Sequence, residues 1–385
     1  MNTHSLLQTP LYALHLEHGG RMVPFAGYTM PLHYATGIME EHRHVRTQAG
    51  LFDVSHMGQV RLYARSGCID DAARALESLV PADILSLAPG RQRYTQFTNA
   101  TGGILDDLMV IRENNSLLLI VNAACKTADI AHLRAHLDSV CDIQPLETYA
   151  LLALQGPKAE EVLATLAPAV REMIFMDVRT LTLNGVPCVV SRAGYTGEDG
   201  FEISVPASHA ESLARILLMH QVVWFIGLGA RDSLRLEGGL CLYGSDIDET
   251  TSPVEAALEW SIQKSRRTGG ARAGGFLGAE TILPQIKNGG DFSQITRRRV
   301  GIRPEGRAPI RHGAPLYADS TLQTQIGVIT SGGFGPTLNA PVAMGYVPPS
   351  HAAIGTPLFT ELRGRSIACT VSALPFVPAG FRRSR

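Results

Sequence analysis

The chain has 385 residues, a formal net charge of −1 and a pI of about 6.9. This length predicts two or three domains, and the nearly balanced charge is unlike that of proteins that bind nucleic acid or anionic membranes. Hydrophobic residues make up 45% and charged residues 18% of the chain, as in ordinary soluble globular proteins, and no apolar run approaches the roughly 18–20 residues of a membrane helix. We therefore expect neither nucleic acid nor a membrane as a partner.

The expected compartment is cytoplasmic. Residues 1–20 contain no apolar signal core and are not rich in arginine, so no signal or transit peptide is expected. A processed eukaryotic chain would instead belong to the mitochondrial matrix. Reduced thiols are expected because the six cysteines stand singly, at Cys68, Cys125, Cys141, Cys188, Cys241 and Cys369.

The first part of the chain predicts a small α+β unit after an irregular opening. Prolines and glycines interrupt residues 9–34, which predicts extended chain and turns. Residues 40–48 predict a polar helix whose His42 and His44 do not share a face as zinc ligands would, and we expect both at the surface. The unit between about 56 and 147 combines strands and helices: strands at 93–98, 105–112 and 116–122, helices at 69–80 and 127–137, the last with Thr127 as N-cap.

A second α+β region begins near residue 149. Its expected elements are strands at 151–154, 186–192 and 201–206 and helices at 157–166, 208–219 and 228–236. Residues 264–275 are basic, rich in glycine and without periodicity, which indicates a linker. Short β-like runs separated by Gly/Pro turns follow, and they predict an all-β barrel or sandwich: 299–302, 325–330, 343–347, 357–362 and 367–371.

An acidic pair interrupts the apolar run between Gly102 and Val110. Successive side chains on a strand point to opposite faces, so Asp106 and Asp107 cannot both enter one cavity. This argues against a glycosidase-like pair of carboxylates built from these two residues alone. One aspartate can face a site while the other is structural, and a polar pair at a strand edge is the alternative.

Familiar local motifs are missing from the sequence. It contains no P-loop, no zinc-protease HExxH and no GxSxG. Gly227–Ala230 lacks the third glycine of a dinucleotide fingerprint, and the loop 194–200 contains two acids that would repel a phosphate. No spacing indicates a metal site, so we expect no nucleotide, metal or serine-hydrolase chemistry.

Six strings taken together are more specific than any single motif. In this order and spacing they closely resemble the glycine cleavage system T proteins (aminomethyltransferases), from about Thr9 to Pro378. The strings are Met30–Tyr34, Phe52–Met57, Gly103–Asp107, Gly194–Glu198, Gly229–Glu237 and Ile329–Gly332.

The resemblance implies a three-domain cloverleaf around a central tetrahydrofolate site. Two α+β domains with ferredoxin-like elements and a C-terminal all-β barrel are expected, in accord with the element pattern. The ranges are 1–55 with 148–263 for the first, folate-binding domain, 56–147 for the second domain with Asp106, 264–278 for the linker and 279–385 for the barrel.

The implied reaction transfers a one-carbon unit to tetrahydrofolate, the co-substrate, without a metal. The donor is the aminomethyl-lipoyl arm of H protein, which acts in one pathway with P and L proteins. Ammonia is released and 5,10-methylenetetrahydrofolate is formed. Two alternatives stay open, namely a non-catalytic folate-binding accessory protein and a folate-dependent demethylase of the same family.

The resemblance also assigns residues to the expected site. Asp106 matches the catalytic aspartate and leaves Asp107 as structural, with a structural edge acid as the alternative for Asp106. Glu202 matches a pterin-binding glutamate, because a carboxylate can accept two adjacent N–H donors, and Arg231 matches a folate-contacting arginine. A solvated strand acid and a helix ion pair are their respective alternatives.

The remaining matches are weaker. Tyr195 and Trp260 match aromatic positions that line the site, although core packing would also explain them, and Met57 and Asn122 match further pocket positions. Phe381 stands where some relatives have a folate-contacting tyrosine, so that hydroxyl contact is missing. The basic segments 266–267 and 297–299 are candidates for contact with an acidic carrier, although such runs are usually solvated.

Overall fold

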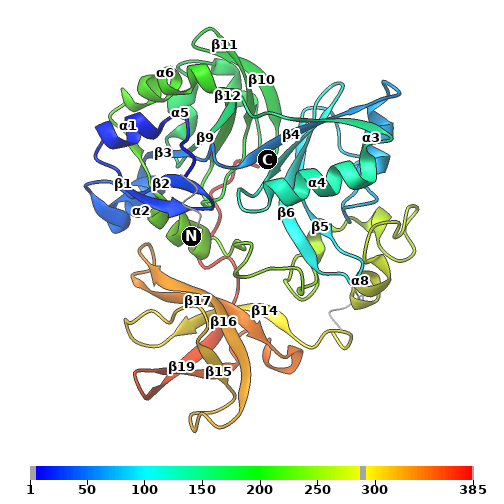
Figure 1. Ribbon diagram of the computed structural model, residues 1–385. Helices are drawn as coiled ribbons and strands as arrows, with labels where there is room; N and C mark the ends of the chain where they lie inside the picture. The colour runs from blue at the N-terminus through cyan, green and yellow to red at the C-terminus, as the bar shows by residue number, and fades with distance from the viewer. Residues whose placement is uncertain (1–5, 287–291, 384–385) are drawn as a thin grey trace.

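The structure is a computed structural model that describes residues 6–286 and 292–383 (Figure 1). It contains a six-stranded sheet, a five-stranded sheet, a short hairpin and a closed β-barrel. The mixed α and β fold with a C-terminal barrel is therefore confirmed. The expected domain ranges 1–55 and 279–385 extend beyond the described residues. No helix within the described part of the chain is long and apolar enough to span a bilayer.

The six-stranded sheet combines strands that lie far apart in the chain. Its order is β10-β11-β12-β9-β3-β13, antiparallel except for the β3–β13 pair. Helices α1 (Tyr12–Glu17), α5 (Ala159–Leu163) and α6 (Ala207–Leu218) cover its outer face with apolar side chains. The strands are β3 (Ala49–Asp53), β9 (Tyr149–Gln155), β10 (Val178–Leu183), β11 (Val186–Ser191), β12 (Gly200–Pro206) and β13 (Val223–Phe225).

The five-stranded sheet has the order β5-β6-β7-β4-β8 and is antiparallel. Helices α3 (Ile69–Leu76) and α4 (Lys126–Leu137) cover its outer face (Figure 1). Helix α4 begins after Cys125 and has no side-chain cap, so the expected Thr127 cap is wrong. The strands are β4 (Gly58–Ala64), β5 (Arg91–Thr98), β6 (Ile104–Arg112), β7 (Leu117–Val121) and β8 (Cys141–Pro145).

The inner faces of the two sheets meet in one apolar cluster. Ile111 and Leu118 of the five-stranded sheet pack there with Phe52 and Leu151 of the six-stranded sheet. Helix α7 (Leu228–Glu237) adds Leu234 to the same cluster. Side chains on these inner faces therefore approach one another although their strands are distant in sequence. The hairpin β1 (Arg21–Phe25) and β2 (Tyr28–His33) and helix α2 (Gly37–Thr47) pack beside α7.

The C-terminal barrel closes in the order β14-β17-β16-β15-β18-β19. Helix α7 contacts its strand β16, which joins the barrel to the six-stranded sheet. The barrel strands are β14 (Arg298–Pro304), β15 (Pro315–Tyr317), β16 (Gln325–Gly335), β17 (Ala340–Val347), β18 (Pro357–Leu362) and β19 (Arg365–Ser372); helix α8 (Ala279–Gln285) precedes them, and short 3-10 turns lie at Pro168–Glu172, Glu259–Ser261, Lys264–Arg266 and Pro349–His351.

The expected contact with a carrier protein is wrong for one arginine in each basic segment. Arg266 and Arg299 are buried, so neither is available to contact a carrier protein. Arg266 lies 3.3 Å from the carboxylate of Glu77, and the Leu277 N–H donates to the carbonyl of Ser78 at 3.1 Å. The segment expected to be a linker is thus packed against the end of the α3 region by charge pairing.

The expectation of surface histidines in α2 is also wrong. His42 is fully buried and lies 3.0 Å from Glu237 of α7, while the ring of His44 stacks on Trp224 at 3.7 Å. Helix α2 is covered on both sides, by α7 and by β13. The polar composition of α2 suggested exposure, but its histidines are buried because they have polar or aromatic partners in the interior.

Candidate functional site

The turn before β6 is held by two glycines. Gly102 has a φ of +90°, a backbone conformation that favours glycine. A side chain at Gly103 would bring its Cβ to 1.8 Å from the carbonyl oxygen of Glu249. The Asn99 side chain accepts the Gly103 N–H at 2.9 Å. These contacts fix the start of β6 against the segment that follows α7.

A β-bulge follows the turn directly. Strand β5 pairs Thr98 with Ile104 but Phe97 with Asp106, so Leu105 is the extra residue. A bulge changes the direction of the side chains that follow it. The orientation of the acidic pair is therefore set at Leu105.

The two aspartates lie on opposite faces of β6, as strand geometry predicts. Asp106 shares its face with Leu108 and Val110, which belong to the apolar core under α3 and α4. Asp107 shares its face with Met109, which packs in the cluster between the two sheets. Only Asp107 is thus on the side of the strand that looks toward the six-stranded sheet and α7.

Asp106 is completely buried beside the start of α4. Its Oδ2 accepts the backbone N–H of Asn122 at 3.0 Å, and its Oδ1 accepts the Asn122 side-chain amide at 2.9 Å. Asp129 and Cys125 lie close enough to Asp106 that its charge raises the pKa of both groups, after burial. Burial raises the pKa of Asp106, and the hydrogen bonds from Asn122 act in the opposite direction. The catalytic role expected for Asp106 stays a prediction.

Asp107 is partly exposed and has a different environment. The Tyr94 hydroxyl donates to its Oδ2 at 2.9 Å, and the Asn122 amide donates to its Oδ1 at 2.8 Å. Burial, and then the negative charge of Asp106, raise the pKa of Asp107 to about 7. Asp107 lies close enough to Tyr195 that its charge, after burial, helps to raise the pKa of that phenol. The residue expected to be structural is therefore the one that faces other predicted site residues.

Asn122 connects the two carboxylates. Its Nδ2 lies 2.9 Å from Asp106 Oδ1, 2.8 Å from Asp107 Oδ1 and 3.1 Å from the Asp107 carbonyl oxygen. An amide nitrogen has two hydrogens, so these three acceptors share its donors. The expected pocket residue Asn122 is thus a fixed bridge across the strand.

Glu202 and Arg231 form the second part of the cluster. Both side chains are half-buried, and neither has a hydrogen-bond partner within residues 6–286 and 292–383. Burial raises the pKa of Glu202 while the positive charge of Arg231 opposes the shift. Burial lowers the pKa of Arg231, against the effects of Tyr195 and Glu202. These two groups are near each other, are partly shielded from water and keep hydrogen-bonding capacity.

Aromatic residues complete the arrangement. The Arg231 guanidinium lies over the Tyr195 ring, 4.7 Å from its centroid, and the Tyr195 hydroxyl donates to the carbonyl of Cys241. Trp260 is 60% exposed and stacks on Tyr94 at 5.4 Å, so the core-packing explanation does not hold for it. Tyr94 links this exposed ring to Asp107.

Two predicted positions are less directly connected to the cluster. Met57 packs in the apolar cluster between the sheets, the same one that contains Met109. Phe381 stacks on Phe175 at 4.1 Å, so the side chain without the tyrosine hydroxyl has an aromatic partner instead.

Sequence reasoning missed Tyr94, Asp129 and the orientation of Asp107. Tyr94 faces Asp107 because the two residues sit on paired strands. Asp129 is buried in the first turn of α4 although its residue type suggests exposure.

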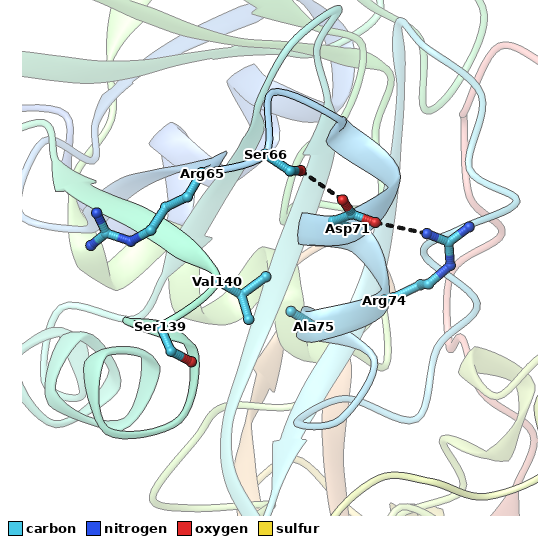
Figure 2. Close-up of a pocket in the computed structure, with 7 residues that line it drawn as sticks. All are labelled: Arg65, Ser66, Asp71, Arg74, Ala75, Ser139 and Val140. Carbon is cyan, nitrogen blue, oxygen red and sulfur yellow. Dashed lines mark hydrogen bonds and ion pairs between the residues drawn. The ribbon is translucent and has the colours of Figure 1, made fainter.

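A surface hollow of about 480 Å³ lies elsewhere, along α3 (Figure 2). Two of its charged groups pair with each other, since Arg74 contacts Asp71 at 2.9 Å, and Ser66 contacts the same carboxylate at 2.6 Å. It contains none of the predicted site residues, being lined by Arg65, Ser66, Asp71, Arg74, Ala75, Ser139 and Val140. Within the described ranges, no group of three His, Cys, Asp or Glu side chains is arranged to hold a metal.

Comparisons with known proteins agree over nearly the whole chain. Residues 11–266 match the family model described as "GCVT N-terminal domain", and residues 297–378 match "Glycine cleavage T-protein C-terminal barrel domain". Relatives named "Aminomethyltransferase, mitochondrial" are 41% identical in Dictyostelium discoideum, over 99% of this chain and 95% of the relative, and 44% identical in Homo sapiens, over 98% and 91%. A crystal structure titled glycine cleavage system aminomethyltransferase T, from Bartonella henselae, has a TM-score of 0.89 at 43% identity and covers 98% of this chain and 100% of that chain. The chain therefore belongs to the T-protein family of the glycine cleavage system, the tetrahydrofolate-dependent aminomethyltransferases.

Proposed function

We propose that the cluster around Glu202, Arg231, Tyr195 and Asp107 binds tetrahydrofolate and receives the aminomethyl-lipoyl arm of an H protein. The observation that carries this proposal is the Glu202 carboxylate, which is half-buried yet has no hydrogen-bond donor among the described residues. The carboxylate is partly removed from water, and its acceptor capacity is not used by the described residues. A ligand with suitable donors can use that capacity.

The pterin ring fits Glu202 by its pattern of donors. Its 2-amino group and N3–H are adjacent, and a carboxylate can accept both in bidentate fashion. Arg231 lies on the face of Tyr195, which leaves its N–H groups available to carbonyl or carboxylate oxygens of the folate. Trp260 and Tyr94 offer stacked aromatic surface for a planar ligand.

Asp107 is the carboxylate that we propose to act in the reaction. Its position on the inner face of β6 and its partial exposure support this role. Asp106 is completely buried, which favours a structural role behind the site. An ionised carboxylate next to the aminomethyl nitrogen can orient the donor and stabilise the positive charge that develops as ammonia leaves. Bound tetrahydrofolate supplies the nitrogens that accept the one-carbon unit.

The proposal also covers the domain boundaries of the chain and its cellular compartment. We propose the domain ranges 1–55 with 148–263, 56–147 and 279–385, supported by one sheet or barrel in each. All six cysteines are free, which supports a reducing compartment. The cytoplasm is our first proposal, and the mitochondrial matrix is the second, because the two relatives are named as mitochondrial.

The test combines the protein with tetrahydrofolate and H protein loaded with the aminomethyl group, and measures ammonia and methylenetetrahydrofolate. We expect ammonia release that depends on both components. Loading the same carrier without the aminomethyl group is the matched control. Folate binding without any release would favour the accessory protein, and turnover of free methylated amines in place of the carrier would favour the demethylase.

A further inference from the structure

A second acidic contact lies behind the proposed site. Asp129, in the first turn of α4, is 3% exposed and lies close enough to the fully buried Asp106 that the charge of Asp106 raises the pKa of Asp129. Its Oδ2 is buried and has no hydrogen-bond partner among the described residues. Two ionised carboxylates this close and this buried repel each other, and neither can donate a hydrogen bond, so a proton on one of them is favoured.

The donors around Asp106 decide which group holds that proton. Asp106 accepts the Asn122 backbone N–H and the Asn122 side-chain amide. These bonds stabilise the ionised form of Asp106. Asp129 has no comparable donors within residues 6–286 and 292–383, and burial, followed by the charge of Asp106, raises its pKa to about 9.

We propose that Asp106 and Asp129 share one proton held on Asp129, and that neutral Asp129 is a positioning residue for Asp107. The connection runs through Asn122, whose single amide contacts the Asp106 and Asp107 carboxylates at 2.9 and 2.8 Å. An ionised Asp106 keeps this amide in place and keeps a negative charge behind Asp107. Asp129 thereby controls both the orientation and the proton affinity of the carboxylate in the site. This inference rests on the proposed role of Asp107.

The other groups that face this pair are neutral. Cys125, before α4, has a pKa raised by burial and then by Asp106. Tyr243, from the segment after α7, has a pKa raised by burial, then by Cys125 and Asp106. Tyr94, on β5, has a pKa raised well above its usual value by burial and then by Asp107. His132, one turn further along α4, has a pKa lowered by burial. No cation therefore competes with the shared proton among these facing groups.

The decisive variant is Asp129→Asn, measured as the pH profile of kcat with aminomethyl-loaded H protein. An amide keeps the neutral charge and the donor, so we expect kcat within about 3-fold of wild type and an acid limb at the same pH. If Asp129 were ionised, this substitution would remove a negative charge and move the acid limb to lower pH by about one unit or more. Such a shift would overturn the proposal. Asp138→Asn, on the exposed C-terminal end of the same helix, is the control and should leave the profile unchanged.

A second variant tests the positioning role. Asp129→Ala removes the donor, so Asp106 should take up a proton and its charge behind Asp107 should be lost. We expect kcat to fall at least about tenfold, the KM for tetrahydrofolate to stay within about 2-fold, and the acid limb to move to lower pH. Wild-type kcat and profile in Asp129→Ala would show that Asp129 does not position Asp107.

A spectroscopic measurement separates this proposal from the proposed reaction. At about pH 8, between the pKa values of Asp107 and Asp129, the wild-type protein should show the infrared carbonyl band of a buried carboxylic acid. The band should remain in Asp107→Asn and disappear in Asp129→Asn. Its absence from wild type would overturn the shared proton, whereas full turnover by Asp107→Asn would overturn only the role of Asp107 in the reaction.

Discussion

Two regions of this molecule hold charged side chains away from full exposure, and they differ in whether those charges have hydrogen-bond partners. At the junction of α7 with the barrel, Asp246 accepts hydrogen bonds from Arg235 and Ser331 at 2.8 Å each and from Thr330 at 2.6 Å. In the proposed site, Glu202 accepts none from the described residues and is offset only by the charge of Arg231. A satisfied buried charge holds two parts of a fold together, whereas an unsatisfied one is available to a ligand. The contrast separates structural from functional charges without reference to their residue type.

The largest effect is expected at the acid of the site. Asp107→Asn should lower kcat by about 10²–10⁴-fold, the range of a general acid–base group, while tetrahydrofolate affinity changes little. Asp106→Asn, measured in parallel, should also lower kcat but with a loss of folded stability, because Asp106 is completely buried among donors. The reverse order, with Asp107→Asn fully active, would restore Asp106 as the reacting carboxylate.

The junction can be broken next. Asp246→Ala leaves Arg235 without its buried ion-pair partner and should lower the free energy of unfolding by about 3–5 kcal/mol. The matched control is Asp232→Ala, which removes the other, 61% exposed partner of the same arginine and should cost about 0–1 kcal/mol. Denaturant unfolding measures both. Equal losses in the two variants would contradict the distinction between paired burial and exposed pairing.

Glu202→Gln should affect binding but not folding. Losing a charged acceptor is worth about 1.5–3 kcal/mol, so the affinity for tetrahydrofolate should fall by about 10–100-fold. Because Glu202 has no donor among the described residues, the unfolding free energy should stay the same or rise. Calorimetric titration measures the affinity for tetrahydrofolate, and thermal unfolding measures the stability. A destabilised variant with normal affinity would show that Glu202 is a structural acid.

The smallest effect is the pH dependence of kcat. Asp107 can act only when ionised, and burial raises its pKa to about 7. The rate should therefore be lost as pH falls through this value, by about tenfold for each unit below it, and approach a plateau above it. A rate that stayed flat down to about pH 5, near an ordinary aspartate pKa, would exclude the raised value.

The sequence predicted the order of elements well because alternation and turn residues are local signals. The strands around Gly102–Gly103 and the barrel strands formed where apolar runs were separated by glycine and proline. Burial of charges was harder to predict, because a partner such as Asp246 for Arg235 or Arg46 for Glu237 comes from another part of the chain. The spacing of charged residues along the helix suggested only ion pairs between neighbours within α7. Glu202 and Arg231 were found through a resemblance, since no local spacing distinguishes them from solvated charges.

The bulge at Leu105 has a consequence for how β6 can vary. After the bulge, neighbouring residues of the strand have the same polarity: two acids, Asp106 and Asp107, are followed by the apolar run Leu108–Ile111. If β6 shifted by one residue against its neighbouring strands, one aspartate would take the place of the other, and apolar residues would replace apolar residues. The polarity of the side chains alone therefore does not define the register. The glycine turn and the bulge define it instead. Insertions or deletions in the Asn99–Leu105 loop would thus decide which aspartate a related protein presents, while its strand sequence stayed the same.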